Sequence, residues 1–366
     1  MRLEVRMNRY SDRPRWHGGL FLVASLWVLL VGGCRRGPKD VPLDQIPLAL
    51  EVVRLDEALY DCSVALRKDS TLPPKTVFDR YFREARGFIT DWMFGGNDSL
   101  ASDSRIGQAM KEFAADPQGQ MLLDTLHVAL GGLDLGALLE NPLKRYKYFF
   151  PAKPTPVVVA FADGYPRTAQ AGLDQISIFP RHLGIGMHYF MGESFLYYPT
   201  DLPHYIRRRC TPEYLPSLVV HQIAEAIVPE PDFRGHPVLV DHVIRAGIVM
   251  VVVDKLLGPS VSDTLKLFYD ASQMDWAHLY EGRIYKDLVT DLYSADPTLQ
   301  RRYLQDSPFT SQLHRGSAPR LGQFMGWKIV SAYLAQHPDM PLDALLQATD
   351  YQRIFKESGY RPPQGH

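Results

Sequence analysis

The side chains most able to do chemistry lie in the stretch VVHQIAEAIVPE, residues 219–230. Zinc peptidases use the helical pattern H-E-x-x-H, in which both His bind the metal and the Glu takes the proton of the attacking water. Here His221 is present, Gln222 stands at the position of that Glu, and Glu225 stands at the position of the second His. The amide of Gln222 has no basicity at working pH, so the pattern lacks its general base.

The same residues are predicted to form an amphipathic helix over 213–228. Its apolar face carries Val219, Val220, Ile223 and Ile227. Its other face carries Leu218, His221, Gln222 and Glu225. We expect this second face to meet solvent or a cleft, and a partly exposed polar face is the simpler interpretation of a lone His and Glu on a helix.

A second helix is predicted over 236–257, and three short strands precede both helices. This order is similar to the gluzincin metallopeptidases, whose second helix carries a Glu just before a Gly as the third ligand. The matching stretch is Arg245-Ala246-Gly247, and the methyl group of Ala246 cannot bind a cation. Sites of this kind need three protein ligands. The residue types therefore predict a pseudoenzyme without catalytic residues, metal or cofactor.

A rearranged zinc site is the alternative. His242 lies four residues before Ala246 on the second helix, so both point the same way. His221, Glu225 and His242 would then form a mixed nitrogen and oxygen site for a working metallopeptidase. The plainer interpretation of His242 is a hydrogen-bonded core residue. Asp241 and Arg245, also four apart, predict an ion pair along the same helix.

The run Arg207-Arg208-Arg209 is a possible binding loop. Guanidinium groups suit carboxylates and phosphates, so the loop and its neighbouring tyrosines could bind an anion or a glycan. Three consecutive side chains on a turn cannot all face one ligand, however. A surface loop in which one Arg is structurally paired is the favoured interpretation.

The N-terminal sequence predicts a lipoprotein signal peptide over residues 1–33. Five Arg residues precede the apolar run LFLVASLWVLLVGG, and V-G-G-C ends at Cys34. This is a bacterial lipobox, in which the thiol of Cys34 receives a diacylglycerol and the protein comes to carry fatty acyl chains such as palmitate. Residues 34–50 are predicted to be the lipidated Cys and a tether, and an uncleaved anchor helix is the alternative. Either prediction places the protein on a membrane outside the cytoplasm.

The remaining chain, 51–366, is predicted to be one α+β domain, mostly helical and zincin-like. It reads as helical to about 150, with a break at Gly131-Gly132, and as short strands over 155–191. Helices then follow, predicted over 213–228, 236–257, 262–271, 274–293, 321–337 and 342–349. Gly322 and Gly326, four apart, predict a close helix contact in the core, with a position lining the cleft as the alternative. The net charge of −1 argues against a nucleic-acid partner. Cys62 and Cys210 could pair or remain buried free thiols.

Several motifs together resemble the GldB family of gliding-motility lipoproteins. They are the lipobox, GMHYFMGES followed by YYP, PHYIRRRCTPEYL, SPFT at 307–310, PRLGQFMGWKIVSAY at 319–333, and SGYRPP. The resemblance covers most of the mature chain, and Cys34 is the one functional residue that it carries over. It implies a cell-envelope protein needed for gliding and for secretion of the motility adhesins, without known catalysis, in a family similar to zincin-like peptidases. We expect an outer-membrane anchor facing the periplasm, with other envelope motility or secretion proteins as partners.

Overall fold

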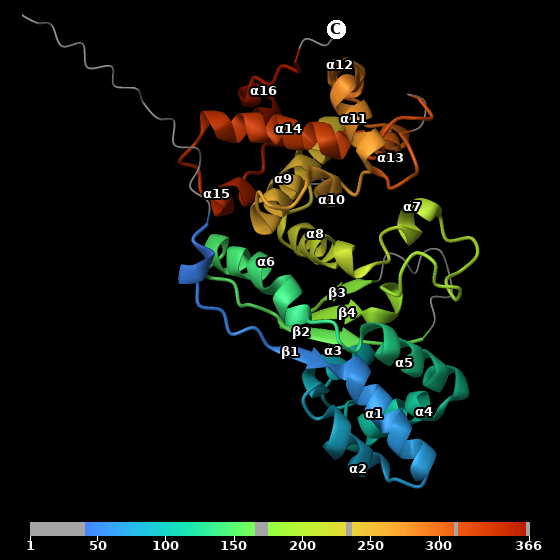
Figure 1. Ribbon diagram of the computed structural model, residues 1–366. Helices are drawn as coiled ribbons and strands as arrows, with labels where there is room; N and C mark the ends of the chain where they lie inside the picture. Colours follow the sequence, from blue (N-terminus) through green and yellow to red (C-terminus); the bar gives the residue numbers. More distant parts are fainter. Residues whose placement is uncertain (1–40, 165–174, 232–235, 311–313, 364–366) are drawn as a thin grey trace, which may run out of the picture. The chain divides into compact units, whose positions relative to one another are not determined.

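The computed structural model describes residues 41–164, 175–231, 236–310 and 314–363. The predicted signal peptide, Cys34 and the first part of the tether lie outside these ranges. The described residues fold into many helices around one small mixed sheet (Figure 1). The predicted α+β, mostly helical class is therefore confirmed.

The sheet has four strands in the order β1-β2-β4-β3. They are β1 (Val52–Arg54), β2 (Val157–Phe161), β3 (Ile176–Ile178) and β4 (His182–Gly186). β2 is parallel to both β1 and β4, and β3 runs antiparallel to β4 at the edge. β2 lies between two strands and reads as a nearly continuous apolar run, as expected for a strand buried on both faces. Three strands were predicted within 155–191; β1 is an addition.

Short helices fill the first half of the domain, as predicted. They are η1 (Leu43–Gln45), α1 (Leu55–Lys68), α2 (Pro74–Val77), η2 (Phe78–Phe82), α3 (Arg86–Phe94), α4 (Asp103–Ala115), α5 (Pro117–Leu130) and α6 (Leu135–Phe149). Ser102, Asp116 and Asp134 each accept a hydrogen bond from the first turn of the helix that follows them, which explains where α4, α5 and α6 begin. The predicted break at Gly131-Gly132 falls between α5 and α6.

Helices also make up the second half. They are η4 (Met187–Tyr189), α7 (His204–Arg207), η5 (Pro212–Tyr214), α8 (Leu215–Ile227), α9 (Leu239–Leu257), α10 (Asp263–Leu267), α11 (Ala271–Leu279), α12 (Glu281–Asp291), α13 (Pro297–Leu304), α14 (Leu321–Gln336), α15 (Leu342–Leu346) and α16 (Tyr351–Ser358). The single helix predicted over 274–293 is two helices, α11 and α12, that meet at Tyr280. α13 and α16 lie beyond the predicted set.

α9 is the buried centre of this half and packs against α8, α14 and α16 (Figure 1). A Cβ atom built on Gly326 would lie 2.2 Å from the carbonyl oxygen of Val243, and one built on Gly247 would lie 2.2 Å from the carbonyl oxygen of Gly326. α9 and α14 therefore touch backbone to backbone. This confirms the close helix contact predicted from the glycine spacing.

Cys62 and Cys210 are both buried free thiols. Burial raises the pKa of Cys62 to about 12 and that of Cys210 to about 11, so neither is a reactive thiolate at neutral pH. Of the two possibilities left open by the sequence, free thiols are what the structure has.

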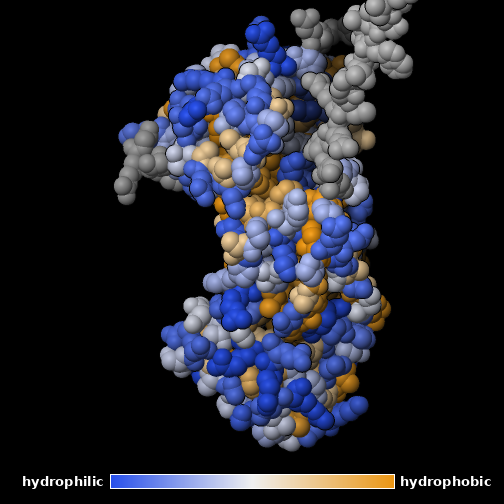
Figure 2. All heavy atoms as spheres, turned by 90° about the vertical axis from the view of Figure 1, so that its left-hand side faces the viewer, coloured by the Kyte–Doolittle hydropathy of each residue, from blue (hydrophilic) through white to orange (hydrophobic). Residues whose placement is uncertain are grey.

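Hydrophilic residues predominate on the face shown in Figure 2, with hydrophobic ones scattered between them. Within the described ranges, no single helix has the length and apolar character needed to cross a membrane; only the pair α5 and α6, bent by 73°, meets those two criteria together.

Candidate functional site

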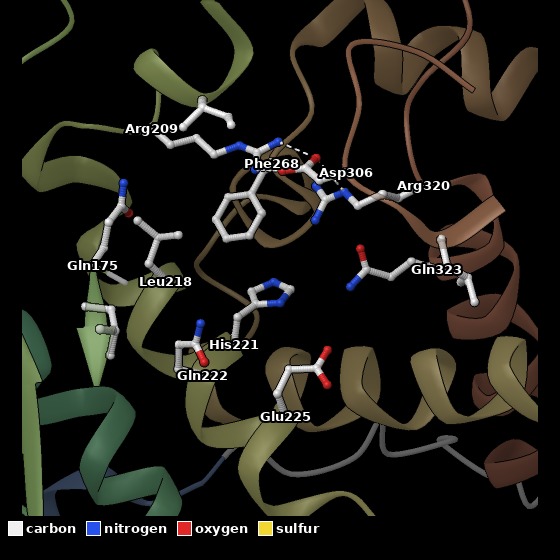
Figure 3. A pocket seen from close by; sticks show the side chains of 13 residues that line it. Gln175, Arg209, Leu218, His221, Gln222, Glu225, Phe268, Asp306, Arg320 and Gln323 are labelled. Carbon is white, nitrogen blue, oxygen red and sulfur yellow. Dashed lines mark hydrogen bonds and ion pairs between the residues drawn. The ribbon is translucent and has the colours of Figure 1, made fainter. Parts of the chain in front are cut away.

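The polar face of α8 lines a cavity of about 280 Å³ (Figure 3). All four residues predicted on that face, Leu218, His221, Gln222 and Glu225, are among its lining residues. The helix begins with a Pro in its first turn, where a missing N–H costs nothing, and ends just before Pro229, which disfavours helical backbone at Val228. The face that was predicted to meet solvent or a cleft therefore meets a cleft.

His221 is buried at the base of this cavity. Its Nε2 lies 2.7 Å from the carbonyl oxygen of Lys266, so Nε2 carries the proton and donates it. Its ring packs 4.6 Å from that of Phe268. Burial lowers the pKa of His221 to about 3, and the Lys266 carbonyl only partly opposes this shift. His221 is therefore neutral at physiological pH.

A neutral buried His makes the stability of the fold depend on pH. Between its unfolded pKa of 6.5 and its folded pKa of about 3, the unfolded chain binds a proton that the folded chain excludes, so stability falls as pH falls. We expect this contribution to remove about 2 kcal/mol between pH 7 and pH 5. His221→Gln keeps a donor for the Lys266 carbonyl but cannot titrate. Between pH 7 and pH 5, its free energy of unfolding should therefore fall by about 2 kcal/mol less than that of the wild type. Urea unfolding of both proteins at pH 7 and pH 5 tests this. The same pH dependence in the variant and the wild type would contradict it.

Glu225 lies at the rim of the cavity and is 45% exposed. It forms an ion pair of 2.6 Å with Arg245, which also pairs with Glu230 at 2.8 Å. The predicted pair between Asp241 and Arg245 is therefore wrong. Arg245 instead donates to the carbonyl of Val228 at the end of α8, where helix carbonyls lack partners, while Asp241 accepts the backbone N–H of Val238 and caps α9.

A charged cluster faces His221 across the cavity (Figure 3). Arg209 donates to both carboxylate oxygens of Asp306, at 2.6 and 3.1 Å, and Nε of Arg320 lies 3.4 Å from the same carboxylate. Burial by itself raises the pKa of Asp306, but Arg320 and Arg209 together bring it below its usual value of 3.8. The cluster thus holds two guanidinium groups on one ionised carboxylate.

Phe268 supports both arginines through its ring face. The guanidinium carbons of Arg209 and Arg320 lie 4.9 and 5.4 Å from the ring centroid, within cation–π range. Phe268 and Arg320 also have left-handed backbones, with φ of 55° and 48°. Non-glycine residues held in this region carry strain, which gathers at functional sites. Two such residues, Phe268 and Arg320, line this cavity, which is what a functional site would show.

The family model described as gliding motility protein GldB matches residues 36–362. The chain belongs to the GldB family. Its role is therefore in gliding motility, and the family name marks it as a lipoprotein, as the sequence motifs indicated. No curated protein and no solved structure matches the chain, and the zincin-like relationship stays a prediction.

In this GldB-family chain, the residues of the predicted rearranged metal site are only partly together. His221 and Glu225 line one cavity, whereas His242 is absent from its lining and lies 3.3 Å from the side chain of Gln300 on α13. Burial lowers the pKa of His242 as well. Within the described part of the chain, no three His, Cys, Asp or Glu side chains gather closely enough to hold a metal ion.

In the GldB-family chain, all three arginines of the Arg207-Arg208-Arg209 loop have protein partners, which corrects the prediction made for this loop. Arg207 donates to the carbonyl of Pro199 at 3.1 Å, Arg208 to Asp270 at 3.2 Å, and Arg209 to Asp306. The expectation of a single paired Arg on a surface loop was wrong. Successive residues of a helical turn point about 100° apart, so they reach three different neighbours, and only Arg209 lines the cavity.

Sequence reasoning missed Phe268, Asp306, Arg320 and Gln323. These residues line the cavity of the GldB-family protein from segments far from α8. The PRLGQF motif contains Arg320 and Gln323, and helix packing in the core was favoured for it over a position lining the cleft. An acidic residue directly before SPFT was the available signal for Asp306, although no local pattern names Arg209, 97 residues away, as its partner.

Proposed function

We propose that this protein is a lipid-anchored component of the cell envelope that supports gliding motility by binding, without catalysis. Cys34 carries the lipid, and the domain serves as a pseudo-metallopeptidase scaffold for other motility or secretion proteins. The anchor lies in the outer membrane and the domain faces the periplasm. The family membership supports the gliding role, and the lipobox supports the anchor.

The observation that carries the non-catalytic part of the proposal is how the remnant motif is engaged. His221 gives its Nε2 proton to the Lys266 carbonyl, and Glu225 is paired with Arg245. Gln222, also in the cavity, cannot take a proton from water. A hydrolytic reaction at this place would need a base at Gln222 and the release of both other side chains from their partners. A binding role needs neither change.

The test is motility of a strain that carries Glu225→Gln in place of the native protein. This variant removes the carboxylate that could act as a ligand or base, and it costs less than about 1 kcal/mol because the pair with Arg245 is exposed on the Glu side. We expect wild-type gliding speed and colony spreading, together with unchanged metal content of the purified full-length protein.

Cys34→Ala is the matched control for this experiment. It should abolish lipid labelling and gliding while leaving the folded domain intact. The proposal fails if Glu225→Gln, at wild-type abundance, stops gliding and also removes a stoichiometric zinc ion or a chelator-sensitive peptidase activity that the wild-type protein has.

A further inference from the structure

We propose that the cavity beside α8 binds the C-terminal carboxylate of a peptide whose last side chain is apolar. This inference rests on the proposed binding role and names what the scaffold binds. Four features of the cavity carry it: an unbalanced positive charge, an unpartnered buried oxygen, an apolar wall and an opening to solvent.

The charge at the inner end of the cavity is unbalanced. Arg209 and Arg320 are 7% and 8% exposed and share the single carboxylate of Asp306. His221 opposite them is neutral, and Glu225 is engaged by Arg245 at the rim. Two guanidinium groups on one carboxylate give this cluster a net charge of about +1, although at the rim Glu225 and Glu230 share the single Arg245. Buried charges are normally paired with a partner close at hand. Nε of Arg209 is also buried without a hydrogen-bond partner in the described structure. A ligand carboxylate completes this site, because guanidinium groups bind carboxylates in a fixed planar geometry.

Gln323 supplies the second and independent observation. Its side chain is 7% exposed, it points from α14 into the cavity (Figure 3), and its Oε1 has no hydrogen-bond partner among the described residues. A buried acceptor left unpaired costs free energy, so a ligand that donates a hydrogen bond to this oxygen would bind more tightly than one that cannot. The amide N–H next to a C-terminal carboxylate is such a donor. An unsubstituted alkanoate such as hexanoate lacks it.

The remaining wall decides what lies beside the carboxylate. Ile176, Ile206, Leu218 and Leu304 line the cavity together with the ring of Phe268. An apolar side chain next to the carboxylate would remove this surface from water. Glu225, at the rim, is 45% exposed, so the cavity opens on that side. Its volume of about 280 Å³ accepts the end of a chain while the rest leaves past the rim.

The test is direct binding to the purified full-length protein in detergent, measured by calorimetry. The probes are acetyl-Ala-Ala-Leu with a free C-terminus, the same peptide as its C-terminal amide, and hexanoate, which has the carboxylate and apolar chain but no N–H. We expect the free acid to bind about tenfold or more tightly than either of the other two. Equal binding of acid and amide, equal binding of hexanoate, or no binding of the free acid at millimolar concentration overturns the inference.

Gln323→Leu is the variant that separates binding from folding. It removes the unpartnered oxygen and keeps a similar shape, so the fold should be at least as stable. It should weaken the peptide acid about fivefold or more and leave weak hexanoate binding unchanged; unchanged peptide affinity counts against the site. Absence of peptide binding leaves the proposed non-catalytic role standing. Cleavage of the peptide by the wild-type protein would instead overturn that role, whether or not the free C-terminus is needed.

Discussion

Asp306→Asn is expected to lower the free energy of unfolding by about 3 kcal/mol. The substitution keeps the shape of the side chain but removes the carboxylate that Arg209 and Arg320 share. Removing one partner of a buried pair costs roughly 3–5 kcal/mol because a buried charge is left uncompensated. We take the lower end because the side chain of Asp306 is 28% exposed. Urea unfolding followed by circular dichroism, at pH 7 and moderate salt, measures the loss.

Asp124→Asn is the matched control for this measurement. Asp124 also forms an ion pair with an Arg, Arg67, but both side chains are well exposed, at 46% and 39%. Its loss should cost less than about 1 kcal/mol. Equal small losses in the two variants would show that the cluster at Asp306 is no more than a surface pair.

The pH dependence of Asp306 has a definite sign. Its folded pKa lies below the usual value of 3.8, so its contribution to stability is complete above that pH and is lost as pH falls through the folded pKa. His221 acts in the higher range, from 6.5 downward. The two groups therefore weaken the fold in succession on acidification, and the same cavity holds both.

The half of the cavity that belongs to α8 could be predicted because a helix repeats every 3.6 residues. That period alone separates His221 and Glu225 from Val219 and Ile223, and the structure follows it. The opposite wall could not be predicted in the same way. Asp306 and Gln323 are placed there by the packing of α13 and α14. No short-range pattern encodes that Asp306 meets Arg209, which lies 97 residues away in the sequence.

Elements with weak local signals were missed for related reasons. β1 has only three residues, too few to show an alternation of apolar and polar side chains. It is a strand because it pairs with β2. Tyr280 separates α11 from α12, and the nearest Gly, Gly282, lies inside α12 and does not mark the break. Arg245 was assigned to Asp241 by the four-residue rule, but the exposed carbonyls and the Glu side chains at the end of α8 compete better for it. Local rules give the contacts that are possible, and tertiary packing selects among them.

Gly326→Ala is expected to destabilise the protein by about 3 kcal/mol, although Ala is ordinarily the better helix former by up to about 1 kcal/mol. The new methyl group would lie 2.2 Å from the Val243 carbonyl oxygen and 2.9 Å from the Gly247 nitrogen. Both atoms are backbone, so no side chain can rotate away and α9 and α14 must separate. Because α14 carries Gln323, we expect affinity for the free-acid peptide to fall as well. Thermal unfolding and the calorimetric assay measure the two effects.

Gly282→Ala provides the control, since Gly282 is also helical but a Cβ there would meet only a carbonyl oxygen at an ordinary 3.7 Å. That variant should be unchanged or slightly more stable, by up to about 1 kcal/mol, with peptide affinity intact. If Gly326→Ala behaved in the same way, α9 and α14 would not be in backbone contact, and the placement of Gln323 in the cavity would lose its support. A loss confined to Gly326→Ala means instead that the glycine contact fixes both the core and the wall of the site.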